Sequence, residues 1–317
     1  MKRVVFISSA FYGLLLIFYL SAYAWDPSVF IVAGERFTSP RADIYIHPRD
    51  GYDGQFYYRL ALDPLTIERT AHGIRLDNPP YRQQRILYPV LAWLVGRVIP
   101  VPWAMLLVNY IALLAVAWLG ASHAIQAGRR PEWGLLFALW PGFLVSLTRD
   151  LTEPLAAALL LAALLTPRRW LSAMLLSLAV LTRETSLLVA LAFPFPFLLL
   201  PIAIYGLWQS SLFAHWDQWP ALAGSVTLAW PPHLFVQGPW LAAQVIAVFA
   251  GLVLFLSPRS RLKLAWFSYL ALVLLASGLI WVEAYAYLRA LTEFYLLGAL
   301  LLIRRSASAP PRPGNYQ

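Results

Sequence analysis

Residues 51–64, GYDGQFYYRLALDP, place acidic and aromatic side chains together in a chain that is otherwise very apolar. Asp53 precedes Gly54, and the residues after it have the pattern of a short amphipathic helix that lies along a membrane surface. A carboxylate at the beginning of a helix is stabilised by the positive end of the helix dipole. Asp53 could therefore be a general base held at a lipid–water boundary, or it could simply cap a helix in a hydrated loop.

Arg82 and Arg85 lie within the sequence YRQQRILYP. An arginine side chain binds phosphate oxygens through two parallel hydrogen bonds, so this pair could hold a phosphate. The alternative is that both side chains extend from an apolar helix to a membrane interface. Spacing alone does not decide between the two.

Asp150 and Glu153 are three residues apart and would share one face of a helix. The two carboxylates could hold a divalent cation, but two acids without a histidine are a weak metal signal. No metal ligand and no cofactor is therefore assigned. Because Pro154 suits the first turn of a helix, Glu153 could instead be the cap of that helix.

Other ionisable residues lie near the ends of apolar segments, where charged side chains indicate function. Arg183 and Glu184 could form an ion pair, and so could Arg289 and Glu293, which are four residues apart. The remaining ionisable candidates are Arg149 and Glu283. Any one of these pairs could be structural, but together they exceed what solvation of loops requires.

The composition predicts an integral membrane protein, because 60% of the 317 residues are hydrophobic and only 12% are charged. The absence of cysteine excludes disulfides and thiolate sites. The net charge of +9 could indicate nucleic acid binding. Many basic residues instead stand in pairs beside apolar runs, as in the cytoplasmic turns of membrane proteins, so no nucleic acid partner is expected.

The predicted fold is an all-α polytopic membrane protein with about ten transmembrane or half-membrane helices and both termini in the cytoplasm. Residues 4–24 form the first span. Their end resembles a signal-peptide cleavage site. Because the apolar stretch is longer than the apolar region of a signal peptide, which usually has about 7–15 residues, we expect no cleavage. Residues 25–85 form a large extracytoplasmic loop, and Glu132 is then the only one of the 15 acids on the cytoplasmic side. Residues 1–305 make one domain, and residues 306–317 are a disordered cytoplasmic tail. The other expected helices are 86–100, 101–125, 133–147, 154–165, 170–181, 186–197, 198–213, 241–256, 264–281 and one from about 288, with the placement around 186–213 the least constrained.

Four motifs resemble the GT-C superfamily of membrane glycosyltransferases, in particular the bacterial relatives of the GPI mannosyltransferases. They are YDGQFY at 52–57, RILYP at 85–89, TRD at 148–150 with Glu153-Pro154, and LTRET at 181–185. The resemblance implies an enzyme of the bacterial cytoplasmic (inner) membrane whose active site faces outward. It would transfer a hexosyl or mannosyl group from a polyprenyl-phosphate donor, with inversion, to a glycan or lipid acceptor in cell-surface glycopolymer formation.

The resemblance also implies roles for the candidates. Asp53 would be the catalytic base. The donor phosphate would be bound by Arg85, Arg183 and Arg289. Sugar or acceptor hydroxyls would be bound or oriented by Arg82, Arg149, Asp150, Glu153, Glu184 and Glu283. The chain is short for this superfamily, so acceptor recognition must come from the outer loops or a partner. Two other functions stay open: a flippase or transporter of lipid-linked saccharides, and a non-catalytic scaffold of an envelope assembly complex.

Overall fold

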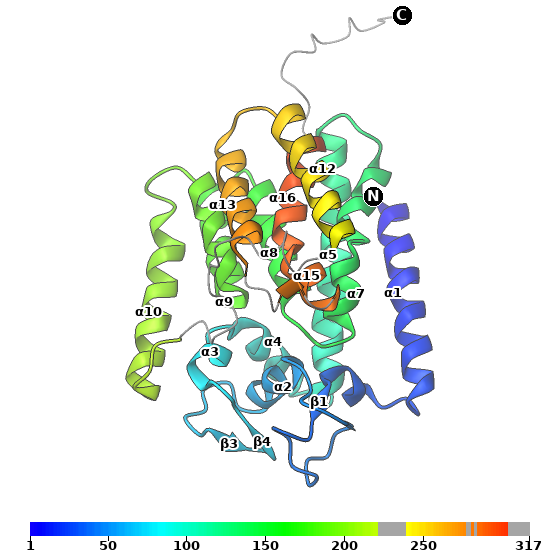
Figure 1. Cartoon of the computed structure of the whole chain (residues 1–317), viewed down its shortest axis with the longest axis vertical. Coiled ribbons are helices and arrows are strands. Elements are labelled where there is room, and N and C mark those ends of the chain that lie inside the picture. Colours follow the sequence, from blue (N-terminus) through cyan, green and yellow to red (C-terminus); the bar gives the residue numbers. More distant parts are fainter. Residues whose placement is uncertain (221–238, 277–279, 282–283, 304–317) are drawn as a thin grey trace, which may run out of the picture.

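The protein is mostly helical, as the sequence predicts. The computed structural model describes residues 1–220, 239–276, 280–281 and 284–303. The helices lie side by side along the long axis, and residues 25–85 gather at one end of them (Figure 1). We call residues 25–85 the loop region. The predicted tail, residues 306–317, and Glu283 lie outside the described residues.

The helices outside the loop region are α1 (Lys2–Ala22), α4 (Leu87–Val95), α5 (Val101–Gln126), η2 (Pro131–Gly134), α6 (Leu135–Ala138), α7 (Pro141–Leu147), α8 (Glu153–Leu165), α9 (Arg169–Thr182), η3 (Glu184–Ala192), α10 (Leu199–Trp216), α12 (Trp240–Leu256), α13 (Arg261–Leu275), α15 (Ala284–Ala290) and α16 (Thr292–Ile303). The loop region contains η1 (Pro27–Ile31), β1 (Ala33–Gly34), β2 (Ile46–His47), α2 (Gly54–Leu62), β3 (Thr70–Ala71), β4 (Ile74–Arg75) and α3 (Pro79–Gln83). The short strands were not predicted; β1 pairs in parallel with β2, and β3 pairs antiparallel with β4.

Two helices in the described part of the chain, α1 and α5, are long and apolar enough to cross a membrane by length and composition. Four further apolar helices are shorter: α8, α9, α12 and α16. The arrangement of about ten spans is therefore not established by helix length. The exposed surface is nevertheless very apolar, since Phe6, Leu14 and Phe18 of α1 are each more than 60% exposed.

Two expected helices differ from the structure because of proline. Residues 133–147 are divided into η2, α6 and α7, since Trp140 precedes Pro141 and has the extended backbone that a following proline favours. Residues 186–197 were expected to be helical over their whole length. The structure has instead the 3₁₀ helix η3, which ends before Pro194 and Pro196, residues that cannot donate a backbone hydrogen bond.

The helix α2 begins directly after Asp53, and the contacts of Gly54 fix its position. A Cβ atom on Gly54 would lie 2.3 Å from the Arg149 carbonyl oxygen and 2.6 Å from that of Ile31, so only glycine allows this approach. The side chain of Gln55 accepts hydrogen bonds from the Gly34 amide and the Thr38 hydroxyl, both at 3.1 Å. The Gln55 contacts hold the start of α2 against residues 34–38, and the close approach of Gly54 places it against the loop that joins α7 to α8.

The side chains of α2 are mostly buried, so this helix packs into the protein instead of lying along its surface as an amphipathic helix would. Phe56 and Leu60 pack with residues of the loop region, and Tyr57 and Ala61 belong to the main core of the bundle. The helix α2 thereby joins the loop region to the bundle, and its N-terminus lies where the two meet.

Candidate active site

The carboxylate of Asp53 lies between two guanidinium groups at the junction of the loop region and the bundle. Its Oδ1 accepts a hydrogen bond from Arg82 Nη1 at 2.7 Å, and its Oδ2 lies 3.0 Å from Arg289 Nη1. Asp53 occupies the N-cap position of α2, as one interpretation predicted, but its side chain makes no capping hydrogen bond and faces the two arginines instead. A residue of the first loop and a residue near the end of the chain therefore meet at one carboxylate.

Arg82 is held from its other side by Asp77. The Asp77 carboxylate accepts hydrogen bonds from Arg82 Nε at 2.8 Å and from Nη2 at 2.7 Å, which leaves Nη1 directed at Asp53. The guanidinium also lies 4.3 Å from the centre of the Phe56 ring. Charge-assisted paired hydrogen bonds of this kind fix orientation as well as charge. Asp77 therefore positions Arg82.

Arg289 joins Asp53 to a second group of charges at the N-terminus of α8. Its Nη1 lies 3.4 Å from Glu153 Oε1, and the same oxygen is 3.1 Å from Arg183 Nη1. Arg183 Nε lies 3.1 Å from Glu293 Oε1. The expected pairs Arg183–Glu184 and Arg289–Glu293 are thus replaced by pairs between different helices. Glu153 does not cap α8 in the way considered above, because its carboxylate faces the two arginines.

Arg85 belongs to a separate pair beside this chain of charges. Glu184 Oε2 accepts a hydrogen bond from Arg85 Nε at 2.8 Å, and Glu184 Oε1 accepts one from Nη2 at 2.6 Å. The remaining Nη1 donates to the Tyr57 hydroxyl at 3.0 Å. The side chains of Arg85 and Glu184 are only 10% and 15% exposed. Arg85 is therefore fixed by partners from α2 and η3.

Arg149 and Asp150, which are adjacent in sequence, point to different surroundings. The Arg149 guanidinium lies 4.7 Å from the centre of the Tyr285 ring and 5.5 Å from that of Tyr52, and Arg289 lies 5.0 Å from the same Tyr52 ring. Asp150 is completely buried. Its Oδ1 accepts a hydrogen bond from the Tyr88 hydroxyl at 3.4 Å. Arg149 is close to the Asp53 cluster, whereas Asp150 is enclosed, which does not fit direct binding of a sugar.

The Asp53 cluster consists of alternating acids and bases: Asp77, Arg82, Asp53, Arg289, Glu153, Arg183 and Glu293. Burial raises the pKa of Asp53, but Arg82 and Arg289 outweigh this effect and hold that pKa well below its usual range. Asp53 is therefore ionised at neutral pH. Burial raises the pKa of the nearby Tyr57 hydroxyl to about 12, so Tyr57 is neutral there.

The described residues contain no group of three or more histidine or acidic side chains that could hold a metal ion. The carboxylates of Asp150 and Glu153, considered above as a cation-binding pair, have different partners. Asp150 contacts Tyr88, and Glu153 contacts two arginines and accepts a hydrogen bond from Ser146 Oγ at 3.2 Å.

The structure brings together most of the residues selected from the sequence and adds two that were missed. Asp77 was not selected, although the sequence DNPPYR contains a recognisable signal: Asn78 caps α3 and proline follows at its first position. That helix start turns the chain so that Arg82 reaches back to Asp77. Tyr57 was also not selected, whereas its hydroxyl accepts a hydrogen bond from Arg85.

The chain matches no protein-family model, and it has no match among curated proteins or solved structures. The geometry of these residues is therefore the basis for a proposed function.

Proposed function

We propose that the protein is an inverting glycosyltransferase of the GT-C type, which moves a sugar from a polyprenyl phosphate to an extracytoplasmic glycan or lipid acceptor. The observation that carries the proposal is the ionised Asp53 carboxylate held between Arg82 and Arg289. A transfer of this kind needs one group that accepts the acceptor's proton and several cations that stabilise the departing phosphate. One cluster offers both.

The proposed setting is the bacterial cytoplasmic membrane, with the loop region outside. The exposed apolar side chains of α1 support contact with lipid, because a soluble surface rarely presents so many large apolar groups together. The N-terminus, which carries Lys2 and Arg3, and the turn between α12 and α13, which carries Arg259, lie at the end opposite the loop region (Figure 1). Basic residues favour the cytoplasmic side. About ten spans, several of them short, complete this topology.

In the proposed reaction the acceptor hydroxyl oxygen attacks the anomeric carbon of the donor sugar. The bond between that carbon and the phosphate oxygen breaks, the phosphate leaves with the electron pair, and the hydroxyl proton passes to Asp53. With both arginines against it, the Asp53 carboxylate is a weak base. A donor phosphate that draws Arg289 away would raise the pKa of Asp53 and make it a better base. Donor binding would thus prepare the proton transfer.

The arginines differ in how readily they could turn to a phosphate. Arg289 has the most exposed side chain, 21%, against 10% for Arg183 and 10% for Arg85. Arg85 also donates two hydrogen bonds to Glu184, which hold it in place. Arg289 is therefore the proposed first contact of the phosphate, and Arg183 and Arg85 supply charge around it.

An apolar pocket of about 330 Å³ is lined in part by sequence neighbours of Arg85 and Arg183. It is lined by Ile86, Leu181, Ile204, Leu207 and Trp208, from α9, α10 and the start of α4. Ile86 follows Arg85 directly, and Leu181 lies two residues before Arg183. The proposal places the first isoprene units of the donor here, because an apolar chain gains about 25 cal/mol for each Å² that it buries.

The principal test is Asp53→Asn in purified protein supplied with polyprenyl-phosphate sugars. Asn keeps the size of the side chain but cannot accept the proton as a carboxylate does. We expect turnover to fall more than about a hundredfold while donor binding is retained. Normal turnover by a folded Asp53→Asn protein would remove Asp53 from the role of base.

The phosphate role is tested by donor binding to Arg183→Ala and Arg85→Ala. We expect both to weaken binding of polyprenyl phosphate. Arg97→Ala is the matched control, because Arg97 is exposed and stacks on Trp93 at 4.3 Å, away from the cluster. Unchanged donor binding in both variants would contradict the phosphate site. Translocation of lipid-linked sugar without transfer would favour a flippase.

A further inference from the structure

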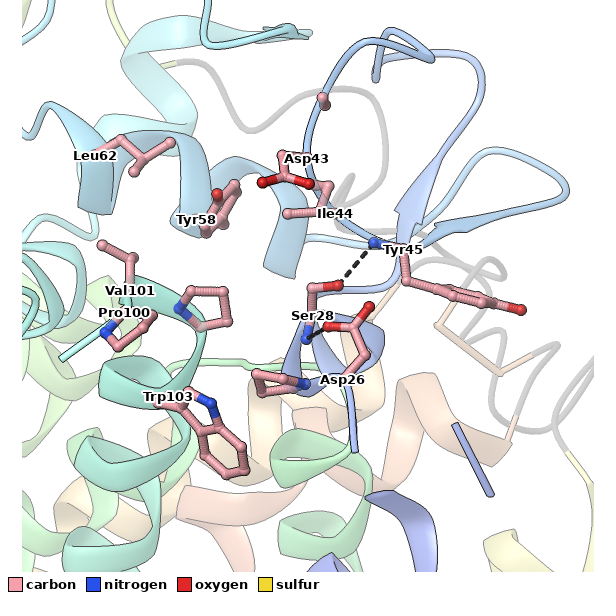
Figure 2. A pocket seen from close by; sticks show the side chains of 13 residues that line it. Asp26, Ser28, Asp43, Ile44, Tyr45, Tyr58, Leu62, Pro100, Val101 and Trp103 are labelled. Carbon is pink, nitrogen blue, oxygen red and sulfur yellow. Dashed lines mark hydrogen bonds between the residues drawn. The ribbon is translucent and has the colours of Figure 1, made fainter. Parts of the chain in front are cut away.

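A second pocket, of about 700 Å³, lies beside α2. Tyr58 and Leu62 line it from α2; they are four residues apart and share one face of the helix. Tyr57, the residue before Tyr58, faces Arg85 instead. The wall opposite α2 comes from residues 26–28 and 42–45, and the start of α5 lies on the same side as α2 (Figure 2). The pocket and the candidate active site therefore both contact α2, through neighbouring residues.

The lining of this pocket has two different sides. Tyr58, Leu62 and Trp103 present ring and aliphatic surface on one side (Figure 2). Asp26, Ser28 and Asp43 present oxygen atoms on the other (Figure 2). No lysine or arginine is among the residues that line it. An ionised carboxylate only accepts hydrogen bonds, so the polar side suits a ligand with several donors and disfavours a phosphate or a carboxylate.

The polar side is held in place by its own hydrogen bonds. Asp26 caps η1 by accepting a hydrogen bond from the Ser28 amide at 2.9 Å. The Ser28 hydroxyl accepts one from the Tyr45 amide at 2.7 Å, which fixes the segment that carries Asp43. A wall that is ordered before binding reduces the entropy lost when a ligand binds.

We propose that this pocket binds a saccharide without acidic groups, as a subsite for the acceptor glycan. A sugar ring has an apolar C–H face and an edge of hydroxyl donors, which match the two sides of the lining. The volume lies within the range of about 300–1,000 Å³ that is usual for small-molecule sites. A single ammonium group, the other ligand that acidic side chains could attract, would leave most of this volume empty. The role as an acceptor subsite rests on the proposed function; the saccharide affinity does not.

The test measures trisaccharide binding to the full-length protein in lipid nanodiscs by saturation-transfer NMR, without any donor. The neutral probes are maltotriose, mannotriose and chitotriose, and the acidic probe is trigalacturonic acid. We expect at least one neutral probe to bind and the acidic probe not to bind. Trp103→Ala and Asp43→Asn should each weaken binding about tenfold, the upper range of one ring contact or hydrogen bond.

The controls are Trp170→Ala and Asp63→Asn, because both residues are exposed and neither lines the pocket. Asp53→Asn should bind the neutral probe as the wild type does, which separates this inference from catalysis. Binding without any transfer would refute the proposed function and leave the saccharide site intact. Transfer with no trisaccharide binding, and with Trp103→Ala unaffected in acceptor KM, would overturn the saccharide site and leave the function intact. Binding of the acidic probe, or displacement of the neutral probe by choline or ethanolamine, would also overturn it.

Discussion

The pair formed by Asp77 and Arg82 gives the sharpest test of how the cluster is held together. Asp77→Ala removes two charge-assisted hydrogen bonds, of 2.8 and 2.7 Å, and leaves Arg82 with Asp53 and the Phe56 ring. Such bonds contribute about 1.5–3 kcal/mol each when buried. The Asp77 side chain is 28% exposed, so solvent weakens them. We expect a total loss of roughly 2 kcal/mol in the free energy of unfolding.

The pH dependence of this loss follows from the sign of the Asp77 shift. Burial raises the pKa of Asp77, but the hydrogen bonds from Arg82 outweigh it and lower that pKa below the usual value. The stabilisation is therefore present at neutral pH and disappears as the pH falls below about 4, where the carboxyl group becomes protonated. The difference between wild type and Asp77→Ala should shrink over the same range.

The assay is urea unfolding in detergent, followed by tryptophan fluorescence, for Asp77→Ala, Arg82→Ala and the double variant. If the pair acts as described, the two single losses will not add, and the coupling should be about 1–2 kcal/mol. Turnover of Asp77→Ala should also fall about tenfold, with a smaller change for Asp77→Asn, which keeps one acceptor oxygen. Additive losses, or a loss that is still unchanged at about pH 2, well below the ordinary pKa of an aspartate, would refute the argument that Asp77 positions Arg82.

Two further substitutions, each with a control variant, test the surroundings of the site. Glu184→Gln leaves the buried Arg85 without its charged partner and should lower the free energy of unfolding by about 3 kcal/mol. The control is Glu132→Gln, at the exposed pair with Arg3 of 3.9 Å, which should change it by less than about 0.5 kcal/mol. Thermal unfolding compares the two variants, and equal losses would contradict the difference in burial. Gly54→Ala should prevent folding or abolish activity, because its Cβ would lie 2.3 Å from a main-chain oxygen. The control is Gly206→Ala, in α10, where no atom lies within 4 Å of the added Cβ; it should be neutral or stabilising by up to about 1 kcal/mol. Expression and unfolding of both glycine variants check this, and a stable Gly54→Ala protein would mean that α2 can move away from the α7–α8 loop.

The helical architecture could be predicted from apolar run lengths, because a long run such as that of α5 has few alternatives to a helix. The positions of the breaks could be predicted only in part. Pro141, Pro194 and Pro196 could have marked the start of α7 and the C-terminal end of η3, but unbroken helices were expected there, and the 3₁₀ geometry of η3 depends on packing that no local pattern records. The number of spans stays a prediction, since several helices are shorter than a membrane is thick.

The sequence by itself determined which residues could take part in chemistry, because charged side chains next to apolar segments are costly and therefore conspicuous. The tertiary structure alone decided which of them meet. Local spacing suggested that Arg289 would pair with Glu293, whereas the fold places Arg289 against Asp53, more than 200 residues away in the chain. It also enclosed Asp150 beside Tyr88. The physical reason is that an ion pair forms between whichever charges the packing of helices brings within about 4 Å, and sequence distance has no part in that geometry.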